Sequence, residues 1–317
     1  MGKAKSKVLA VPIPKKKGNT WRYIRSHKWL YLLFLPGLIY FIVFKYIPMA
    51  GLIIAFQQFS PYRGFLGSEW VGLYHFQNLF SGSDFRMLME NTLILSILNL
   101  IFYFPAPIIL ALLLNEMRSQ MYKRITQTLV YIPHFISFVI VYTLTYQLLN
   151  VNDGIVNQII EAVTGHTVNI LGEPEYFRGL IVGQNIWKET GYGTIIFLAA
   201  LSGVDLQLYE AAEVDGAGRL RMLWHITLPS IRGTIVLMLI LKVGTIMNTG
   251  YEQIFLMAND LNVSKAEVFD TYVYKRGITM GQYSYATAVG FFKSFVAMIL
   301  VLFSNWLAKR CGESGLY

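Results

Sequence analysis

The 317-residue chain is poor in cysteine and in charge, with one cysteine and 14% charged residues. The single thiol, Cys311, excludes an internal disulfide framework and implies no reactive thiol. No Gly-x-x-x-x-Gly-Lys-Ser/Thr phosphate loop occurs, which excludes the usual mode of ATP binding. The five histidines are scattered without metal-ligand spacing: His27, His75, His134, His166 and His225. We therefore predict no catalytic residue, no metal site and no cofactor bound by this chain.

Apolar residues dominate what is present: 55% of the chain is hydrophobic and the mean hydropathy is +0.46. Such a chain is too apolar for a water-soluble domain. A spanning helix needs about 20 mostly apolar residues, because its backbone polar groups must pair within the segment. The sequence predicts an all-α polytopic membrane protein with six spans, at 29–56, 91–114, 125–149, 179–201, 233–251 and 283–308. Pro48 and Gly51 are expected to kink or end the first span.

Basic residues predict the orientation. The loops on the N-terminal side of the membrane carry more Lys and Arg than the opposite loops, and residues 3–28 contain no acidic residue. The positive-inside rule then places both termini in the cytoplasm of a bacterium, with the chain in its cytoplasmic membrane. The basic tail abuts a span, so anionic membrane lipid suits it better than nucleic acid.

This pattern divides the chain into four parts. Residues 1–28 form a basic cytoplasmic tail and residues 29–308 form the transmembrane domain. Within that domain, residues 203–232 form a cytoplasmic loop between the fourth and fifth spans. Residues 309–317 form a cytoplasmic C-terminal tail.

The loop before the fifth span has helix start and stop signals. Asp205 is a good N-cap for a helix that begins at Leu206, and Gly216 offers a place to end it. A second helical stretch is expected at 219–224, with Pro229 stopping it before the span begins. The result is a short surface helix with Glu210 and Glu213 on one face.

Residues 210–229 resemble the EAA loop of ABC importer permeases, the segment that docks on an ATP-hydrolysing subunit. The resemblance implies that ten residues couple this chain to the ATPase: Glu210, Ala211, Ala212, Glu213, Asp215, Gly216, Ala217, Ile226, Leu228 and Pro229. It also implies the type I importer permease fold. The implied partners are a second permease subunit in a heterodimer, two ATPase subunits that carry ATP and Mg²⁺, and an external solute-binding protein.

Three further segments are similar to permeases of oligosaccharide and polysaccharide importers, a group that includes alginate importers. These segments are residues 44–51, 70–72 and 187–191. The resemblance extends over nearly the whole chain and implies a saccharide substrate.

Four charged residues fall inside the predicted spans at similar depth: Lys188, Glu189, Lys242 and Lys293. Charges there are costly and face a partner or a cavity. One interpretation is structural, with Glu189 neutralising one lysine and the others pairing elsewhere. The other is a pathway that attracts an anionic saccharide, with amides, hydroxyls and aromatic rings to bind sugar. The pathway residues would be Gln184, Asn185, Trp187, Lys188, Glu189, Tyr192, Lys242, Asn248, Tyr251 and Lys293.

Two other classes of function are alternatives. An ion-coupled secondary sugar transporter could use Lys188 and Glu189 directly, but it has no use for the 210–229 segment. A membrane glycosyltransferase would require acidic metal or sugar-nucleotide ligands in a cytoplasmic loop, and none occurs outside that segment. ATP-dependent uptake by reconstituted vesicles distinguishes the three.

Overall fold

The computed structural model describes residues 25–312 and residue 315, and these form helices with one two-stranded sheet. Contacts divide the chain into two units, Met1–Leu52 and Ile53–Tyr317. The first unit carries α2 (Lys28–Phe41), the π turn η1 (Ile42–Tyr46) and α3 (Ile47–Met49), and the 3₁₀ turn η2 (Ala50–Phe56) follows. Together they form one helical stretch, Lys28–Phe56, apolar enough to cross a membrane. The predicted basic tail lies largely outside the described residues.

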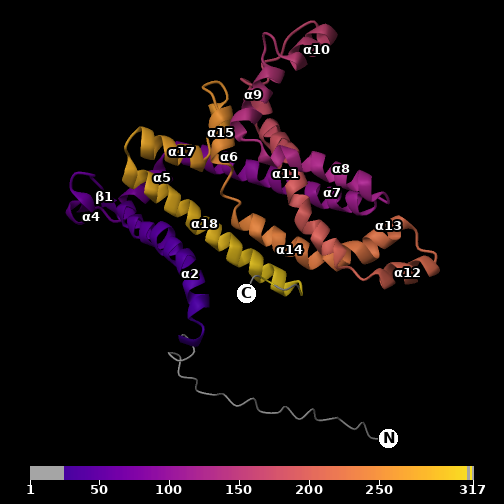
Figure 1. Ribbon diagram of the computed structural model, residues 1–317. Coiled ribbons are helices and arrows are strands. Elements are labelled where there is room, and N and C mark those ends of the chain that lie inside the picture. Colours follow the sequence, from indigo (N-terminus) through magenta and orange to yellow (C-terminus); the bar gives the residue numbers. More distant parts are fainter. Residues whose placement is uncertain (1–24, 313–314, 316–317) are drawn as a thin grey trace. The chain divides into compact units, whose positions relative to one another are not determined.

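The second unit contains the remaining membrane-length helices (Figure 1). Asp84–Asn115 is one helical stretch that comprises α6 (Asp84–Leu98), the π turn η3 (Asn99–Tyr103) and α7 (Pro105–Asn115). α11 (Pro174–Ser202) packs most extensively against α7. α14 (Leu228–Gly244) packs against α18 (Tyr283–Arg310). These four segments confirm predicted spans, although most begin earlier than expected.

Two pairs of helices are bent, one within the predicted span 125–149 and one after the predicted span 179–201. α8 (Gln120–Tyr131) with η4 (Ile132–Phe135) meets α9 (Phe138–Leu149) at 97°, and α11 meets α12 (Leu206–Val214) at 70°. The span expected at 125–149 is therefore present as a broken span. Pro133 lacks an N–H, Ile136 is extended, and the Ser137 hydroxyl caps the start of α9, so the backbone leaves the helix between residues 135 and 138. Counting each bent pair as one, the described residues contain up to six spans.

Prolines inside the membrane helices do not end them. Pro48, Pro105 and Pro229 each follow a π turn that ends two residues earlier, and the turn before Pro229 is η5 (Leu223–Thr227). A proline ring clashes with the carbonyl four residues back, and the wider π turn relieves this clash. The expected stop at Pro229 is therefore wrong, because Arg219–Gly244 is one helix from α13 (Arg219–Met222) onward. The first span does not end at Pro48 and Gly51 either: the α-helix changes to a 3₁₀ helix at Ala50 and the helical stretch continues to Phe56.

The fifth span also ends sooner than predicted. α14 ends at Gly244, and residues 245–250 form a non-helical connection to α15 (Tyr251–Met257). Beyond it lie α16 (Val263–Ala266), α17 (Phe269–Tyr274) and the π turn η6 (Lys275–Thr279). Six residues of the predicted span are therefore not helical, and this connection contributes to a cavity described below.

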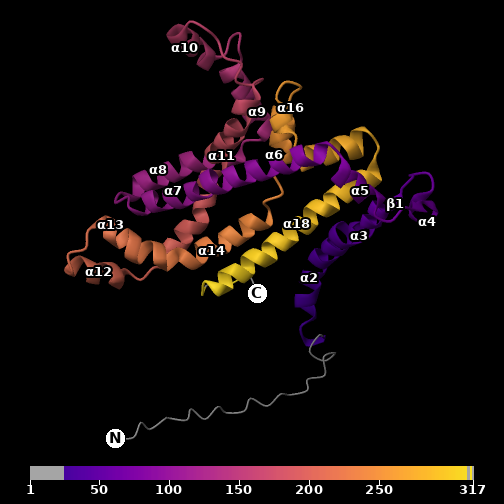
Figure 2. The same ribbon diagram turned by 180° about the vertical axis from the view of Figure 1, so that it is seen from behind.

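Short elements form the loops opposite α12. They comprise α4 (Gly64–Gly67), α5 (Tyr74–Ser81), α10 (Ile155–Thr164) and the strands β1 (Gln57–Gln58) and β2 (Glu69–Trp70), which pair antiparallel. The two views agree that α5 and α17 lie near the start of α18, whereas α12 and α13 lie at the other end of the unit (Figures 1 and 2).

Three apolar clusters hold the second unit together. One joins α6, α11, α15 and α16 through buried residues such as Leu95 and Phe177. A second joins α5, α6, α17 and α18 around Phe269. The third joins α7, α11 and α14 around Phe197. Because α11 takes part in two of the three clusters, its side chains are placed between the other helices.

Candidate functional site

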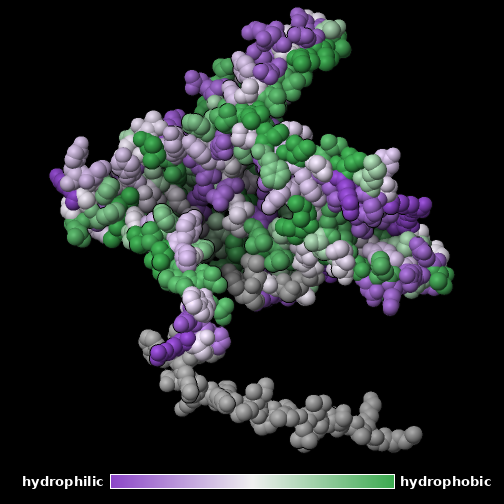
Figure 3. Space-filling model, in the orientation of Figure 1, coloured by the Kyte–Doolittle hydropathy of each residue, from purple (hydrophilic) through white to green (hydrophobic). Residues whose placement is uncertain are grey.

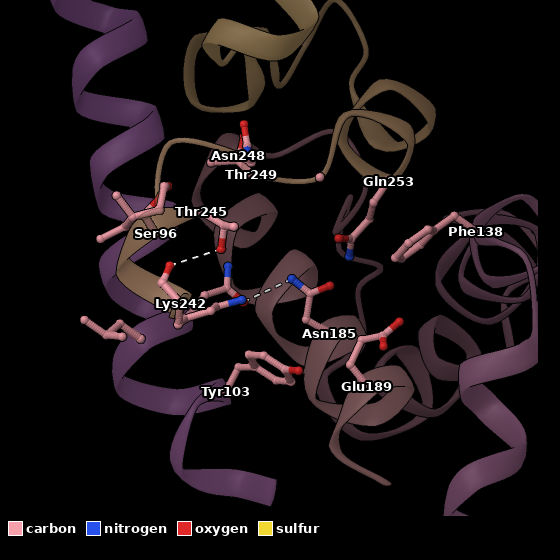
Figure 4. A pocket seen from close by; sticks show the side chains of 14 residues that line it. Ser96, Tyr103, Phe138, Asn185, Glu189, Lys242, Thr245, Asn248, Thr249 and Gln253 are labelled. Carbon is pink, nitrogen blue, oxygen red and sulfur yellow. Dashed lines mark hydrogen bonds between the residues drawn. The ribbon is translucent and has the colours of Figure 1, made fainter. Parts of the chain in front are cut away.

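A polar cavity of about 300 Å³ lies among α6, η3, α11, α14 and the 245–250 connection (Figure 4). Hydrophilic residues also gather in a hollow on the face shown in Figure 3, between stretches of hydrophobic surface. The cavity is lined by Ser96, Asn99, Leu100, Tyr103, Phe138, Asn185, Glu189, Lys242, Thr245, Ile246, Asn248, Thr249, Gly250 and Gln253. Four of the ten predicted pathway residues line it: Asn185, Glu189, Lys242 and Asn248.

Hydrogen bonds fix the amides of the cavity wall. The Asn185 amide donates to Asn99 Oδ1 at 3.0 Å, and Asn99 in turn donates to the Leu95 carbonyl at 3.0 Å. Gln253 donates to Gln184 Oε1 at 2.8 Å and to a carbonyl of α11 at 3.1 Å. A wall fixed in this way presents polar atoms in set directions, as a saccharide site requires.

Two groups in the cavity lack a polar partner. The Thr249 hydroxyl is buried without a hydrogen bond in the described chain. Lys242 Nζ lies 4.7 Å from the centre of the Tyr103 ring, and no described carboxylate lies within ion-pair distance of it. Burying an unpaired ammonium is unfavourable. A ligand with hydroxyl and carboxylate groups would satisfy both.

Lys188 has a different environment, at the break between α8 and α9. Its ammonium donates to the His134 carbonyl at 2.6 Å and pairs with Glu189 Oε1 at 3.0 Å. Glu189 Oε2 lies 2.7 Å from His134 Nδ1. The broken helix leaves carbonyls without partners, and a lysine there supplies both a donor and a favourable charge. The structural interpretation of Lys188 is the one that this geometry supports.

Lys293 is also paired. Its ammonium contacts Asp270 Oδ1, and Asp270 Oδ2 accepts from the Thr249 N–H at 3.2 Å. A carboxylate from α17, outside the predicted spans, therefore neutralises Lys293. Lys293 does not line the cavity. It holds Asp270, which in turn accepts a hydrogen bond from Thr249, a residue of the cavity wall.

The other predicted pathway residues lie apart from this cavity. Gln184 and Trp187 line an apolar groove between α9 and α11. Tyr192 stacks on His134, with ring centres 3.9 Å apart, and Tyr251 stacks on Phe255 at 5.3 Å. Sequence reasoning missed residues that line the cavity, among them Ser96, Asn99 and Tyr103. Their spacing of three and four residues in an apolar span places them on one helical face, and this signal was available.

The 205–229 segment forms the predicted surface helix. Asp205 Oδ1 accepts from the Gln207 N–H at 3.0 Å, which confirms the N-cap. Gly216, at φ +73°, ends α12, with Ala217 N–H donating to the Ala212 carbonyl at 2.9 Å and Gly216 N–H to the Glu213 carbonyl at 3.0 Å. This pair of bonds is a Schellman motif, which the left-handed glycine permits.

A second contact joins α12 to η5 across the turn at residues 215–218, which we call the elbow. The Tyr209 and Thr227 hydroxyls are 2.9 Å apart, and Thr227 is buried. Glu210 and Glu213 are exposed, and so are apolar residues of the same segment, including Val214, Leu220 and Trp224. An exposed apolar patch beside carboxylates is typical of a protein interface. A small cavity in the elbow is lined by Ala212, Asp215, Ala217, Arg221, Met222, His225 and Ile226.

Residues 103–312 match the family model described as "Binding-protein-dependent transport system inner membrane component". The chain belongs to this family. It is a multi-pass ABC importer permease with the type I fold, and permeases of this family are non-catalytic membrane subunits. The comparisons do not favour an ion-coupled secondary transporter.

Several relatives resemble the permease over most of its length. It is 54% identical over 302 residues to Protein LplB of Bacillus subtilis, covering 95% of each chain. It is also 54% identical to the polygalacturonan/rhamnogalacturonan transport system permease protein YteP of the same organism, covering 92% of this chain and 91% of that one. In a crystal structure of a bacterial ABC transporter that imports the acidic polysaccharide alginate, one chain is 41% identical, with a TM-score of 0.85 over 92% of this chain and 98% of that one.

Proposed function

We propose that this permease belongs to an ATP-driven importer of acidic oligosaccharides or polysaccharides. The observation that carries the proposal is Lys242, an ammonium without an ion-pair partner among the described residues, in a cavity that amides, hydroxyls and aromatic rings line. Glu189 also lines this cavity, but its carboxylate oxygens are bonded to Lys188 and His134. A carboxylate on a sugar ring would pair with it, while the amides bind ring hydroxyls. The relatives support this class, since polygalacturonan and alginate are both polymers of uronic acids.

The proposed assembly contains four kinds of component. This chain pairs with a second permease subunit, and two ATPase subunits hold ATP and Mg²⁺. An external solute-binding protein delivers the saccharide. A solved relative supports this last partner, because that alginate transporter was crystallised with a pentasaccharide-bound periplasmic protein; its matching chain is 40% identical, with a TM-score of 0.86 over 93% of this chain and 99% of that one.

In this assembly α12 is the docking element. Its exposed carboxylates and apolar side chains suit a cleft with basic and apolar walls. The Schellman turn at Gly216 and the contact between Tyr209 and Thr227 hold α12 against the start of Arg219–Gly244. Because that stretch is one helix that continues to Lys242, a push on α12 is passed toward the cavity. The proposal has α12 and both termini in the cytoplasm, as the positive-inside rule predicts.

Uptake by the whole transporter in proteoliposomes tests the proposal. With its partners and ATP inside the vesicles, the transporter should take up radiolabelled trigalacturonate, and without ATP it should not. The neutral methyl ester of the same trisaccharide is the matched competitor. ATP-driven uptake of the ester with none of the acid would contradict an acidic substrate, and uptake driven by an ion gradient alone would contradict the ABC assignment.

A pair of glycines tests the coupling role. Gly216→Val forces a β-branched residue into a left-handed conformation and should weaken the turn by about 1–2 kcal/mol. Gly218 lies at φ −73°, and a Cβ there would meet nothing within 4 Å, so Gly218→Val is the control. Uptake and saccharide-stimulated ATP hydrolysis should fall in the first variant and stay near normal in the second. Equal activity of the two variants would count against a rigid coupling turn.

A further inference from the structure

A second polar cavity, of about 550 Å³, lies beside α5, α17 and the start of α18, at the end of the second unit opposite α12 (Figure 1). We call it the outer cavity. It is built from α5, the end of β1, α17 with η6 and the start of α18. None of the residues predicted for coupling or for the pathway lines it.

The floor of the outer cavity is a fixed polar cluster. Asp84 Oδ2 accepts from the Tyr272 hydroxyl and from Arg276 Nη2, each at 3.1 Å. The Tyr272 and Tyr285 hydroxyls are 3.3 Å apart. Burial and the hydrogen bonds to Tyr285 and Asp84 raise the pKa of Tyr272, so this phenol stays protonated and keeps donating to Asp84. The cluster presents an acid, a guanidinium and phenols in fixed positions.

The walls of the outer cavity carry aromatic rings and free amides. Tyr74 is 52% exposed and Tyr283 is 38% exposed, so both have ring surface open to solvent. The side-chain amides of Gln58, Asn78 and Gln282 make no hydrogen bond in the described part of the chain. A ring face stacks on the apolar face of a pyranose, and amides with an Asp–Arg pair bind adjacent sugar hydroxyls.

We propose that the outer cavity is a saccharide subsite that binds one pyranose unit of the transported oligosaccharide through its hydroxyls and ring face. The proposal rests on the proposed function for the nature of the substrate. The two cavities recognise different features. The outer cavity has its guanidinium already paired with Asp84, so it binds the sugar irrespective of charge, whereas the cavity at Lys242 binds the carboxylate.

A contact with the solute-binding protein is the competing use of this surface. The concave shape and the unbonded amides fit a sugar ring. The two uses predict different results when the binding protein is left out.

Calorimetric titration of trigalacturonate into the full transporter in nanodiscs, without the solute-binding protein, tests the subsite. A Lys242→Met background removes the carboxylate partner in the other cavity. In that background Tyr283→Ala and Asn78→Ala should each weaken binding by about three- to tenfold. Tyr283→Phe retains the stacking ring and should bind nearly as well as its parent. Tyr62→Ala is the control, because Tyr62 is fully exposed on a neighbouring loop and does not line the cavity.

The outcomes separate this subsite from the proposed function. An unchanged Kd in both Tyr283→Ala and Asn78→Ala, or no binding by the parent at millimolar trigalacturonate, overturns the subsite. Weaker affinity for the solute-binding protein with an unchanged trigalacturonate Kd assigns the surface to that protein and also overturns it. Intact, Tyr283-dependent binding without ATP-driven uptake contradicts the proposed function and leaves the subsite standing.

Discussion

Two lysines of the membrane helices differ in whether their charge has a partner within the chain. Lys188 on α11 is 5% exposed, pairs with Glu189 and donates to a carbonyl left free by the break after α8. Lys242 on α14 lines the polar cavity, with its Nζ 4.7 Å from the centre of the Tyr103 ring. One ammonium has an ion-pair partner in its own chain, and the other has none among the described residues, so we propose that a ligand pairs with it. The partner of a charge, and not its depth, decides whether it is available for recognition.

The backbones of α11 and α8 are in close contact near Lys188. A substitution at this contact is expected to cause the largest loss of stability. A Cβ added at Gly191 would lie 1.8 Å from the Val130 carbonyl oxygen, so α11 and α8 touch through their backbones. Gly191→Ala should destabilise the permease by about 3 kcal/mol or more. Gly183→Ala on the same helix is the control, since nothing lies within 4 Å of its added Cβ. Thermal unfolding of the purified transporter measures both, and similar melting temperatures would show that α8 does not pack as described.

Lys188→Met should give the next largest effect. Removing the ammonium leaves Glu189 and the His134 carbonyl without their donor, and breaking a buried pair costs about 3–5 kcal/mol. Lys242→Met removes no acidic partner and should leave the melting temperature within a degree or two of the parent's. If the two variants lost stability equally, the contrast between these lysines would be wrong.

Glu189→Gln is a milder change at the same cluster. The amide retains the shape and one acceptor, so we expect a loss of about 1–2 kcal/mol. In a double-mutant cycle with Lys188→Met, the combined loss should be smaller than the sum of the single losses, because the pair is removed together. Strictly additive losses would mean that the two side chains do not stabilise each other.

The sequence anticipated the local features well. Asp205 and Gly216 mark the limits of α12, and apolar length predicts four of the spans, because caps and hydrophobic runs are properties of neighbouring residues. The span at 125–149 was predicted but its break was not, since the break depends on a donor from α11 as well as on Pro133. The ion pair of Lys293 with Asp270 joins residues of α18 and α17. The hydrophobic periodicity of the sequence does not indicate contacts between different helices, so this pair was not predicted.

Only part of the cavity wall was predicted, because the wall is also formed by residues of different elements. Residues of α11 and α14 were identified by their charge, but Thr249 and Gln253 were not, because the helix ends at Gly244 and folds the chain back. Ser96 and Asn99 could have been identified from their spacing. The partnership of Lys188 with a free carbonyl requires three-dimensional contacts, so sequence alone left its two interpretations open.

The most direct test of the account is the selectivity of Lys242 variants for charge. Uptake of trigalacturonate and of its neutral methyl ester is measured for the parent, Lys242→Met and Lys242→Arg in the same proteoliposomes. A charge-assisted bond contributes about 1.5–3 kcal/mol, so Lys242→Met should lower the acid-to-ester ratio of kcat/KM by about ten- to a hundredfold. Lys242→Arg retains the charge and should recover much of the ratio. A ratio that stays the same in Lys242→Met would contradict carboxylate recognition at this cavity.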